Sequence, residues 1–185
     1  MNTQIWMAEN LNYEVENSYC YYNNPDTCTK YGRLYTWAAA MDSVGRYSTS
    51  GKGCGYGLTC QSTYPVRGVC PEGWRLPDST EWKKLIRGLY IMPDAGKKLK
   101  AAYDWRYLEQ YYGTDYYLFT ALPAGLRQAS GEYDQLHDNT YYWSSTENDR
   151  GSAYSMRLYY GSSDASLVNN SYKSTAFSVR CIKNL

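Results

Sequence analysis

The six cysteines are the residues with the most specific chemistry in this sequence. They stand at Cys20, Cys28, Cys54, Cys60, Cys70 and Cys181, an even number without the close Cys/His spacing of a zinc site. Such usage is typical of three disulfides, and disulfides persist in an oxidising compartment, so we expect secretion or surface display. Six cysteines can pair in several ways, and spacing alone does not choose among them. We expect the pairs Cys20–Cys28, Cys54–Cys60 and Cys70–Cys181.

Acid–base catalysis has little support in the sequence. The one histidine, His137, lies in the polar segment 134–139 beside Asp138, and no serine near it sits on the strained turn of a hydrolytic triad. A lone loop histidine beside acids is usually solvated, and one histidine is too few for a zinc site once the cysteines are paired. We therefore expect a protein that is not an enzyme and that needs no cofactor.

Two other segments could bind ions. Glu147 and Asp149, with nearby carbonyls, could hold a structural calcium ion, although carboxylates in surface loops are usually only solvated. The glycines of residues 48–57 resemble a phosphate-binding loop, but no Lys-Ser/Thr pair follows them and no strand-to-helix context surrounds them. We expect that segment to be a surface loop tied by a disulfide.

The C-terminal quarter has the composition of an adaptable contact surface. Residues 141–185 hold 10 Ser, 6 Tyr and 4 Asn, close to the mixture of antibody loops, in which rigid rings give contact area and small polar groups give adaptable hydrogen bonds. A plain hydrophilic loop tip is the alternative. We predict that the ligand-binding residues are Asn148, Asp149, Arg150, Arg157, Tyr159, Asp164, Asn169, Asn170, Tyr172 and Lys173.

Strand alternation bears on part of this set. Tyr154, Met156 and Leu158 share one face of a predicted strand, and Arg157 and Tyr159 share the other. Either Tyr154 or the Arg157 and Tyr159 pair should therefore point inward. We expect Arg157 and Tyr159 to point outward, because burying an unpaired guanidinium costs more than burying a tyrosine whose hydroxyl finds a partner.

Turn and helix signals in the middle of the chain must position these groups. Two prolines and a glycine keep residues 71–77 out of regular structure, and Asp78 followed by Glu81 is the capping pattern of a helix start. An apolar stripe follows at helical spacing: Trp82, Leu85, Ile86 and Leu89. A second stripe predicts another helix: Leu34, Trp37, Ala38 and Met41. Four tryptophans should be largely buried: Trp37, Trp74, Trp82 and Trp143.

Alternating or apolar segments predict strands over residues 4–11, 118–123, 142–146, 153–160 and 176–183. Residues 12–30 are typical of a disulfide-closed loop or hairpin, residues 95–100 of a short helical turn, and residues 161–175 of a polar connection. In the last strand Cys181 points into the core, where it could meet Cys70 at the helix start. The fold class is α+β.

Composition limits the class of protein further. With 19 basic and 18 acidic residues and no run of like charge, no nucleic-acid partner is expected. The segment has no apolar stretch near the roughly 20 residues that span a bilayer. Residues 1–4 do not resemble a signal peptide, so we expect a mature or trimmed chain that forms one domain over residues 1–185. The 23 Tyr, against 2 Phe, are more than a core can hold, because each buried hydroxyl needs a partner.

Several segments resemble, in order and spacing, the Fibrobacter succinogenes major paralogous domain family: residues 6–11, 31–41, 70–82, 121–125, 143–147 and 177–181. The resemblance covers nearly the whole chain. A cysteine, a turn and a helix, with a second cysteine on the last strand, are also similar to the C-type lectin fold, in the branch of formylglycine-generating enzymes and retroelement variable proteins. That similarity implies a loop-rich, disulfide-stapled domain in which two helices flank a small twisted antiparallel sheet.

The sequence departs from the active members of that fold. Formylglycine-generating enzymes use a reactive cysteine pair shortly before the terminal segment, and residues 141–180 contain no cysteine. Sugar-binding C-type lectins hold calcium with a Glu-Pro-Asn or Gln-Pro-Asp tripeptide and a Trp-Asn-Asp, whereas the comparable place here reads Trp143-Ser144-Ser145. Neither cysteine oxidation nor a calcium-dependent sugar site of that kind is expected.

We therefore expect a secreted or cell-surface, non-enzymatic binding module, extracellular or on an outer-membrane surface, whose ligand is a polysaccharide or a surface protein. One alternative is a retroelement-diversified receptor, because adenine-targeted mutagenesis of Asn codons yields Asn, Tyr, Ser and Asp at scattered positions. Another is a structural subunit of a surface fibre, which would self-associate without added ligand.

Overall fold

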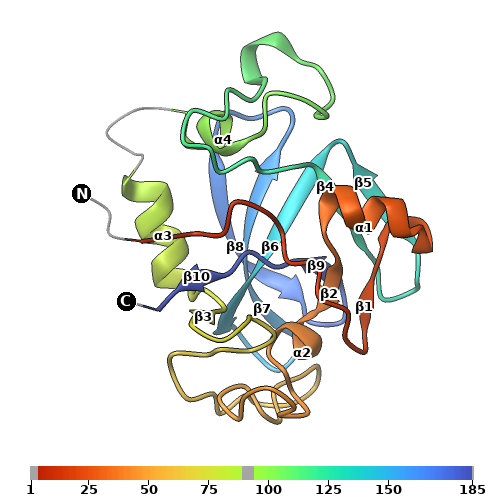
Figure 1. The fold of residues 1–185 in the computed structure, drawn as a ribbon, viewed down its shortest axis with the longest axis vertical. Coiled ribbons are helices and arrows are strands. Elements are labelled where there is room, and N and C mark those ends of the chain that lie inside the picture. The colour runs from red at the N-terminus through yellow and green to blue at the C-terminus, as the bar shows by residue number, and fades with distance from the viewer. Residues whose placement is uncertain (1–3, 89–93, 185) are drawn as a thin grey trace.

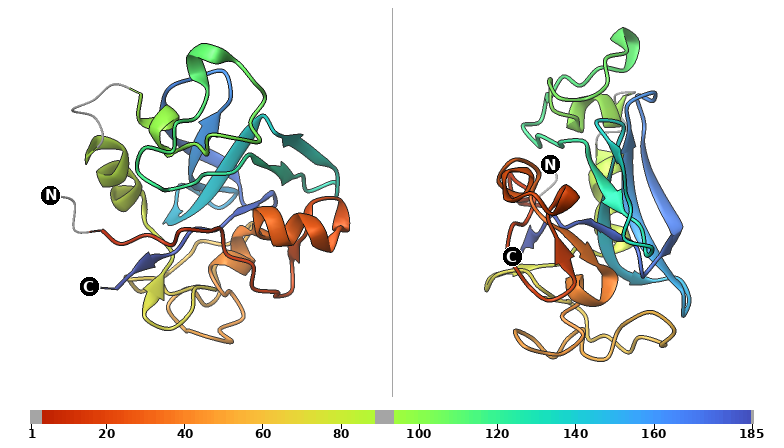
Figure 2. Two further views of the ribbon diagram at one scale, coloured as in Figure 1. Left: turned by 45° about the horizontal axis from the view of Figure 1, so that its top comes forward. Right: turned by 90° about the vertical axis from the view of Figure 1, so that its right-hand side faces the viewer.

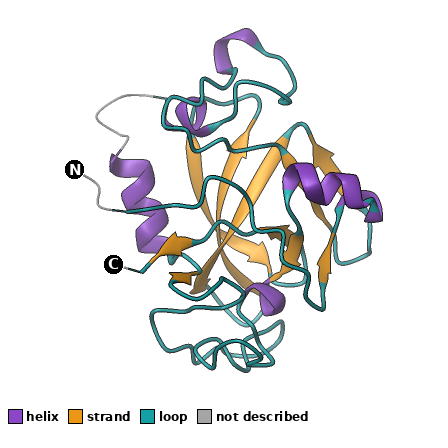
Figure 3. Cartoon of the chain, viewed as in Figure 1, coloured by secondary structure: helices purple, strands orange, loops and turns teal. Residues whose placement is uncertain are grey.

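The main chain of this computed structural model is described for residues 4–88 and 94–184. Figures 1 and 3 show an α+β molecule with one large sheet, short helices around it and long loops. Its described helices are η1 (Tyr21–Asn23), α1 (Pro25–Tyr31), α2 (Trp37–Ala40), α3 (Ser79–Gly88), α4 (Ala95–Leu99) and η2 (Glu109–Tyr111). Its described strands are β1 (Ser18–Tyr19), β2 (Leu34–Thr36), β3 (Trp74–Arg75), β4 (Ala124–Arg127), β5 (Tyr133–Leu136), β6 (Asn139–Glu147), β7 (Ser152–Tyr159), β8 (Ala165–Tyr172), β9 (Ala176–Ser178) and β10 (Ile182–Lys183).

The main sheet has eight strands in the order β1-β2-β9-β4-β6-β7-β8, with β5 beside β4. Strands β6, β7 and β8 form an antiparallel meander, whereas β6 pairs in parallel with both β4 and β9. Figure 2 (right) shows this meander as one layer, with α1 and the N-terminal segment on one side of it. The expected small antiparallel sheet is therefore part of a larger sheet, which is mixed because β6 pairs in parallel with β4 and β9.

Two of the three predicted C-terminal strands are confirmed. Residues 142–146 lie within β6 and residues 153–160 largely coincide with β7. The third prediction, 176–183, is wrong in its middle: the chain leaves β9, and β10 pairs instead with β3 in a separate two-stranded sheet.

Strand β8 occupies residues for which a polar connection was expected. Its backbone pairs with β7 along most of its length, and Leu167 packs against the core. Because β8 is the last strand of the sheet, Asn169 and Asn170 can stay exposed. An edge strand with polar exposed side chains looks like a loop in sequence, which is why the prediction failed.

Two other predicted strands are not strands. Residues 4–11 form one isolated bridge, Trp6 to Ile182, and run beside the C-terminal segment through Met7 N–H to Cys181 O (3.1 Å) and Leu11 N–H to Val179 O (2.9 Å). In residues 118–123 one bridge joins Ala121 to Lys100, and Leu118 has φ 55° and is exposed. A left-handed residue interrupts the extended backbone that a strand needs.

Helix α3 confirms its predicted start. The Asp78 carboxylate accepts from Glu81 N–H (2.7 Å), and the Glu81 carboxylate accepts from Asp78 N–H (3.0 Å), a reciprocal capping box. Trp82 and Leu85 of the predicted stripe are buried, and Ile86 is partly buried. The fourth stripe residue, Leu89, lies outside the described residues.

The N-terminal helices differ from their predictions. Leu34 belongs to β2, so the second predicted helix shrinks to α2, whose first turn is capped by Thr36 accepting from Ala39 N–H (3.3 Å). Residues 25–31, expected to be loop, form α1. Its polar start explains the error: Asn24 accepts from Asp26 N–H (3.0 Å) and Pro25 opens the helix, so turn residues act here as a helix cap. The short helix α4 was predicted.

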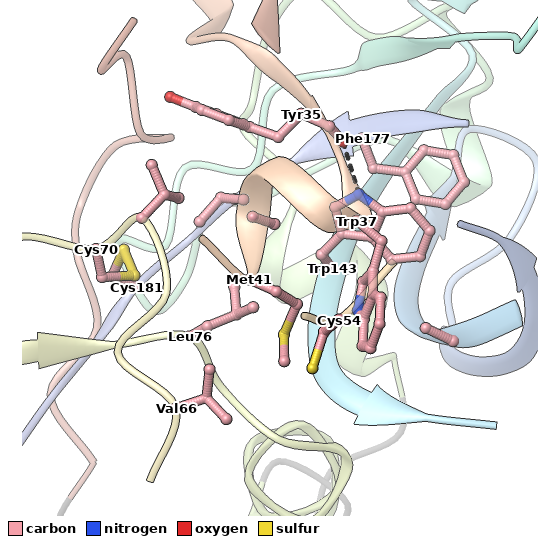
Figure 4. Close-up of a cluster of buried hydrophobic side chains, with 14 of the residues drawn as sticks. Tyr35, Trp37, Met41, Cys54, Val66, Cys70, Leu76, Trp143, Phe177 and Cys181 are labelled. Atoms are coloured by element: carbon pink, nitrogen blue, oxygen red, sulfur yellow. Dashed lines mark hydrogen bonds between the residues drawn. A yellow bond between two sulfur atoms is a disulfide. The ribbon is translucent and has the colours of Figure 1, made fainter. Parts of the chain in front are cut away.

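Strand β6 is buried on both faces, because Trp143 lies in one core and Tyr142 in the other. One core, shown in Figure 4, gathers Trp37, Trp143 and Phe177, and Trp143 Nε1–H donates to Tyr35 O (2.7 Å). A second core packs Trp82 of α3 against strands β6 and β7. Three of the four predicted tryptophans are fully buried, but Trp74 is only half-buried, because it sits in the outlying β3–β10 pair.

All three expected disulfides are present: Cys20–Cys28, Cys54–Cys60 and Cys70–Cys181. The last one, visible in Figure 4, joins the turn before α3 to the C-terminal segment. Within residues 4–88 and 94–184, no helix has the length and apolar character to cross a membrane.

Candidate ligand-binding surface

Nine of the ten predicted ligand-binding residues separate into two groups, and Lys173 belongs to neither. Antiparallel pairing sets Ser152 opposite Tyr172 at one end of the β7–β8 hairpin and Leu158 opposite Ala165 at the other. A strand of 8 residues spans about 25 Å, so the groups are far apart. The first group lies by the β6–β7 turn: Asn148, Asp149, Arg150, Asn169, Asn170 and Tyr172, all exposed. The second lies by the β7–β8 turn: Arg157, Tyr159 and Asp164.

Arg157 and Tyr159 are half-buried, and so is Tyr154. Arg157 Nε–H donates to Asn139 Oδ1 (2.9 Å), and its guanidinium lies 5.8 and 5.1 Å from the ring centroids of Tyr141 and Tyr159. The choice between Tyr154 and the other two does not arise, because the pairing of β7 with both neighbours shifts between Ala153 and Ser155. A register shift breaks the strict alternation on which that choice rested.

The β7–β8 turn is anchored from beneath by Lys100, whose importance the sequence did not reveal. Its side chain is fully buried, and Nζ donates to the backbone carbonyls of Tyr111 (2.7 Å), Tyr159 (3.0 Å) and Ser162 (2.9 Å). Burial lowers the pKa of Lys100 to about 8. The second group of predicted residues thus sits on a turn whose backbone is held in place.

Lys173 was predicted to contact ligand and is buried instead, with only 1% of its surface exposed. Its ammonium group forms an ion pair with Glu147 and lies 4.5 Å from the Trp37 ring centroid. It also donates to the carbonyls of Gly55, Leu58 and Arg150, each at 3.2 Å. Because a buried ammonium must be paired and hydrogen-bonded, these contacts explain why Lys173 points inward.

The Lys173 and Glu147 pair holds two loops together. The Glu147 carboxylate accepts from Cys60 N–H (3.0 Å), so the disulfide loop of residues 54–60 is fixed to the end of β6. Gly57 N–H donates to Arg150 O (2.8 Å), and Arg150 Nε–H donates to Thr59 Oγ1 (3.2 Å). We call the surface formed by residues 54–60, 148–151 and 169–172 the loop platform.

Large side chains project from the loop platform. Tyr56, Leu58 and Tyr172 are 64%, 54% and 69% exposed. Tyr172 lies opposite Ser152 in the sheet, and Ser152 Oγ accepts from Asn148 Nδ2–H (3.0 Å), which places Tyr172 near Asn148. Tyr56 and Leu58 were not predicted. A loop closed by a disulfide over so few residues cannot bury both a tyrosine ring and a leucine side chain. This limit was the feature of the sequence that could have predicted their exposure.

Glu147 and Asp149, the carboxylates considered for calcium, already have partners within the protein. Both oxygens of Glu147 accept from Cys60 N–H, and the carboxylate pairs with Lys173. Asp149 Oδ1 accepts from the N–H groups of Gly151 and Ser152 (2.7 Å each), and hydrogen bonding to Ser152 lowers the pKa of Asp149. No cluster of three or more His, Cys, Asp or Glu suited to a metal occurs among residues 4–88 and 94–184.

His137 lies outside the loop platform, and the cysteines provide no reactive group. The His137 ring is exposed, and Nδ1 lies 2.7 Å from Asp104 O. All six cysteines are in disulfides, so none offers a free thiol. The arrangement on the platform suits binding through rings, amides and a guanidinium.

Comparison with known proteins gives one result. The family model described as the Fibrobacter succinogenes major domain matches residues 1–183. Neither a curated protein nor a solved structure matches the chain.

Proposed function

The chain belongs to the Fibrobacter succinogenes major domain family, and we propose that it is a secreted or cell-surface, non-enzymatic binding module that contacts a polysaccharide or a surface protein through its loop platform. The observation that carries this proposal is the exposure of Tyr56, Leu58 and Tyr172 on loops fixed by the Cys54–Cys60 disulfide and the buried Lys173. The disulfides also support an oxidising, extracellular setting.

Preorganisation is the physical reason for choosing this surface. A ligand that binds mobile loops must order them, which costs about 0.5 to 1.5 kcal/mol for each immobilised side chain. The platform backbone is already held by the bonds among Lys173, Glu147 and Arg150. Exposed tyrosines then provide contact area at low entropic cost, and Arg150 with the asparagines provides hydrogen bonds.

Single substitutions on the platform test the proposal. We expect Tyr172→Ala to weaken capture of the ligand by about tenfold, because an aromatic ring at a binding surface often contributes roughly 1 to 3 kcal/mol to the binding free energy. Tyr116→Ala is the matched control, since Tyr116 is 65% exposed and lies in the η2–β4 loop outside the platform. Equal losses in both variants, or no loss in Tyr172→Ala, would contradict the proposal.

A C-type lectin-like fold is part of this proposal. The Cys70–Cys181 bridge between the start of α3 and the C-terminal segment supports it, as does the N-terminal segment running beside that same segment. A solved structure whose helix and strand connections differ from the C-type lectin pattern would overturn it.

A retroelement-diversified receptor is the second candidate function. The observation that favours it is the gathering of Asn148, Asn169, Asn170 and Tyr172 on one exposed surface. Genomic sequence tests it directly: a nearby template repeat that differs only at adenines supports this function, and a locus without such a repeat excludes it.

A further inference from the structure

A second surface lies away from the loop platform, where η1 meets the β4–β5 hairpin. Figure 1 shows β5 and the loop with residues 54–60 on different sides of the molecule. A shallow, open depression of about 560 Å³ lies there. Its lining combines two aromatic rings with polar groups: Tyr22, Tyr133, Asn23, Gln128, Glu132 and Asp134. We call it the tyrosine depression.

The rings of the tyrosine depression are fixed in place. Tyr22 is 68% exposed, yet its ring centroid lies 4.8 Å from that of Tyr21 and 5.5 Å from that of Tyr133. Tyr133 Oη–H donates to Asn23 Oδ1 (2.7 Å). One ring is therefore presented to solvent on a cluster that does not need to reorganise when a ligand arrives.

The backbone beneath the exposed ring is strained. Tyr22 and Asn23 have φ 52° and 54°, in the left-handed region that a bulky residue seldom adopts. The Cys20–Cys28 disulfide and the bond from Asn23 N–H to Cys20 O (2.9 Å) hold this conformation. Because strain of this kind persists only where the surroundings enforce it, and gathers at binding sites, it points to a role for the ring.

Polar groups at the rim can accept hydrogen bonds. Asp134 uses Oδ1 to accept from Gln135 N–H (2.7 Å), which leaves its second oxygen for a ligand. Glu132 accepts from Ser130 Oγ (3.2 Å) through one oxygen only. Arg127 is not part of the lining, although its guanidinium lies 5.7 Å from the Tyr133 ring centroid.

We infer that the tyrosine depression binds a pyranose unit of a neutral polysaccharide. A pyranose has an apolar C–H face, which the Tyr22 ring can cover, and a rim of hydroxyls, which can donate to Asp134 and Glu132. Two carboxylates at the rim disfavour an anionic ligand. A lipid chain is also disfavoured, because it would remove water from the polar rim without replacing the lost hydrogen bonds. This site deepens the proposed function and rests on it for the extracellular setting, but it uses residues that the loop platform does not.

The decisive variant is Tyr22→Gly, because glycine adopts positive φ without cost. It removes the ring and keeps the backbone, and the relief of strain offsets the lost ring contacts, so its melting temperature should stay close to that of the parent. Affinity for hydroxyethyl cellulose, xylan, galactomannan, laminarin and, as an anionic comparison, polygalacturonate is measured by affinity electrophoresis. We expect at least one neutral polymer to bind the parent, Tyr22→Gly to bind it at least tenfold more weakly, and Tyr22→Phe to bind within threefold of the parent.

Tyr172→Ala separates this inference from the proposed function. If Tyr172→Ala binds the neutral polymers as the parent does while Tyr22→Gly fails, the tyrosine depression is the saccharide site, and only a surface protein is left as the ligand of the loop platform. If Tyr22→Gly binds as the parent does and Tyr172→Ala fails, the inference is overturned and the loop platform stands. If the parent binds none of the neutral polymers, or only polygalacturonate, the inference is overturned, while the proposed function is still tested by protein ligands.

Discussion

The buried ammonium group of Lys173 pairs with Glu147 and donates to the carbonyls of two separate loops. Its removal should therefore lower the free energy of unfolding. Truncating one partner of a buried ion pair leaves the other charge uncompensated. We expect Lys173→Ala to lower the free energy of unfolding by about 3 kcal/mol, measured by urea denaturation. Lys52→Ala, at an exposed lysine, is the control and should change it by less than about 0.5 kcal/mol.

Platform geometry provides a second readout for Lys173→Ala. Without the ammonium group, residues 54–60 lose two of the bonds that fix them to the rest of the platform. Amide exchange at Gly57 and Cys60 should accelerate in the variant. Unchanged exchange and a stability loss under about 1 kcal/mol would mean that the disulfide alone holds the loop.

Residue patterns predicted apolar burial better than the burial of charge. Trp37, Trp82 and Trp143 lie in segments whose apolar residues repeat at helix or strand spacing, and this spacing alone predicts their burial. Lys173 lies in a run of Ser, Asn and Tyr, and its burial depends on Glu147 and on a loop more than a hundred residues earlier in the chain. No local pattern records such a partner, so the polar surroundings suggested an exposed side chain.

At the scale of elements, the capping box of α3 links local sequence to the second core. The Asp78 carboxylate accepts from Glu81 N–H. The helix then places Trp82 between the strands and the N-terminal segment, with its ring centroid 4.5 Å from that of Trp6. We expect Asp78→Ala to destabilise the protein by about 1 kcal/mol, seen as a lower urea midpoint with an unchanged slope.

Thr80→Ala is the matched control for the cap. Thr80 is exposed in the same first turn, so its loss should change stability by less than about 0.5 kcal/mol. If the two variants are equally stable, Asp78 contributes nothing as a cap and the start of α3 is fixed by tertiary packing alone.

Elements with a strong local signature were predictable, and elements defined by pairing were not. The start of α3 and the alternation in β6 and β7 are determined by residues that are close together in the sequence. Strand β8 is polar because it lies at an edge, and α1 begins with residues that also suit turns. For the predicted site, exposure near residues 148–150 and 169–172 could be foreseen from polarity, whereas Tyr56 and Leu58 join it only through contacts made by the folded chain.

At the scale of the molecule, the Cys70–Cys181 disulfide closes the longest loop, with a sequence separation of 111. In the chain-entropy model a bridge of that length contributes about 4 to 5 kcal/mol. Replacing both cysteines with alanine should therefore lower stability by that amount, measured by denaturation of the oxidised protein. The Cys20→Ala and Cys28→Ala pair, which opens a much shorter loop, should cost about 2 to 3 kcal/mol. Equal costs for the two double variants would contradict the loop-length explanation.

The α+β class and the three disulfide pairs could be predicted from the sequence, but the extent of the sheet could not. Its order brings β2 and β9 together from distant parts of the chain, and β6 pairs in parallel with β4 and β9. Such contacts depend on how the whole chain closes, which residue spacing does not encode.

We propose that this molecule binds its ligand through the loop platform and without a metal ion. The most direct measurement is capture on an array of polysaccharides and surface proteins by the parent and by the Tyr172→Ala, Arg150→Ala double variant, each with and without a chelator. We expect the parent to capture at least one ligand, the chelator to leave capture unchanged, and the double variant to lose at least tenfold in affinity for at least one captured ligand at an unchanged melting temperature. Capture that needs a divalent ion, or that survives fully in the double variant for every captured ligand, would contradict the proposal.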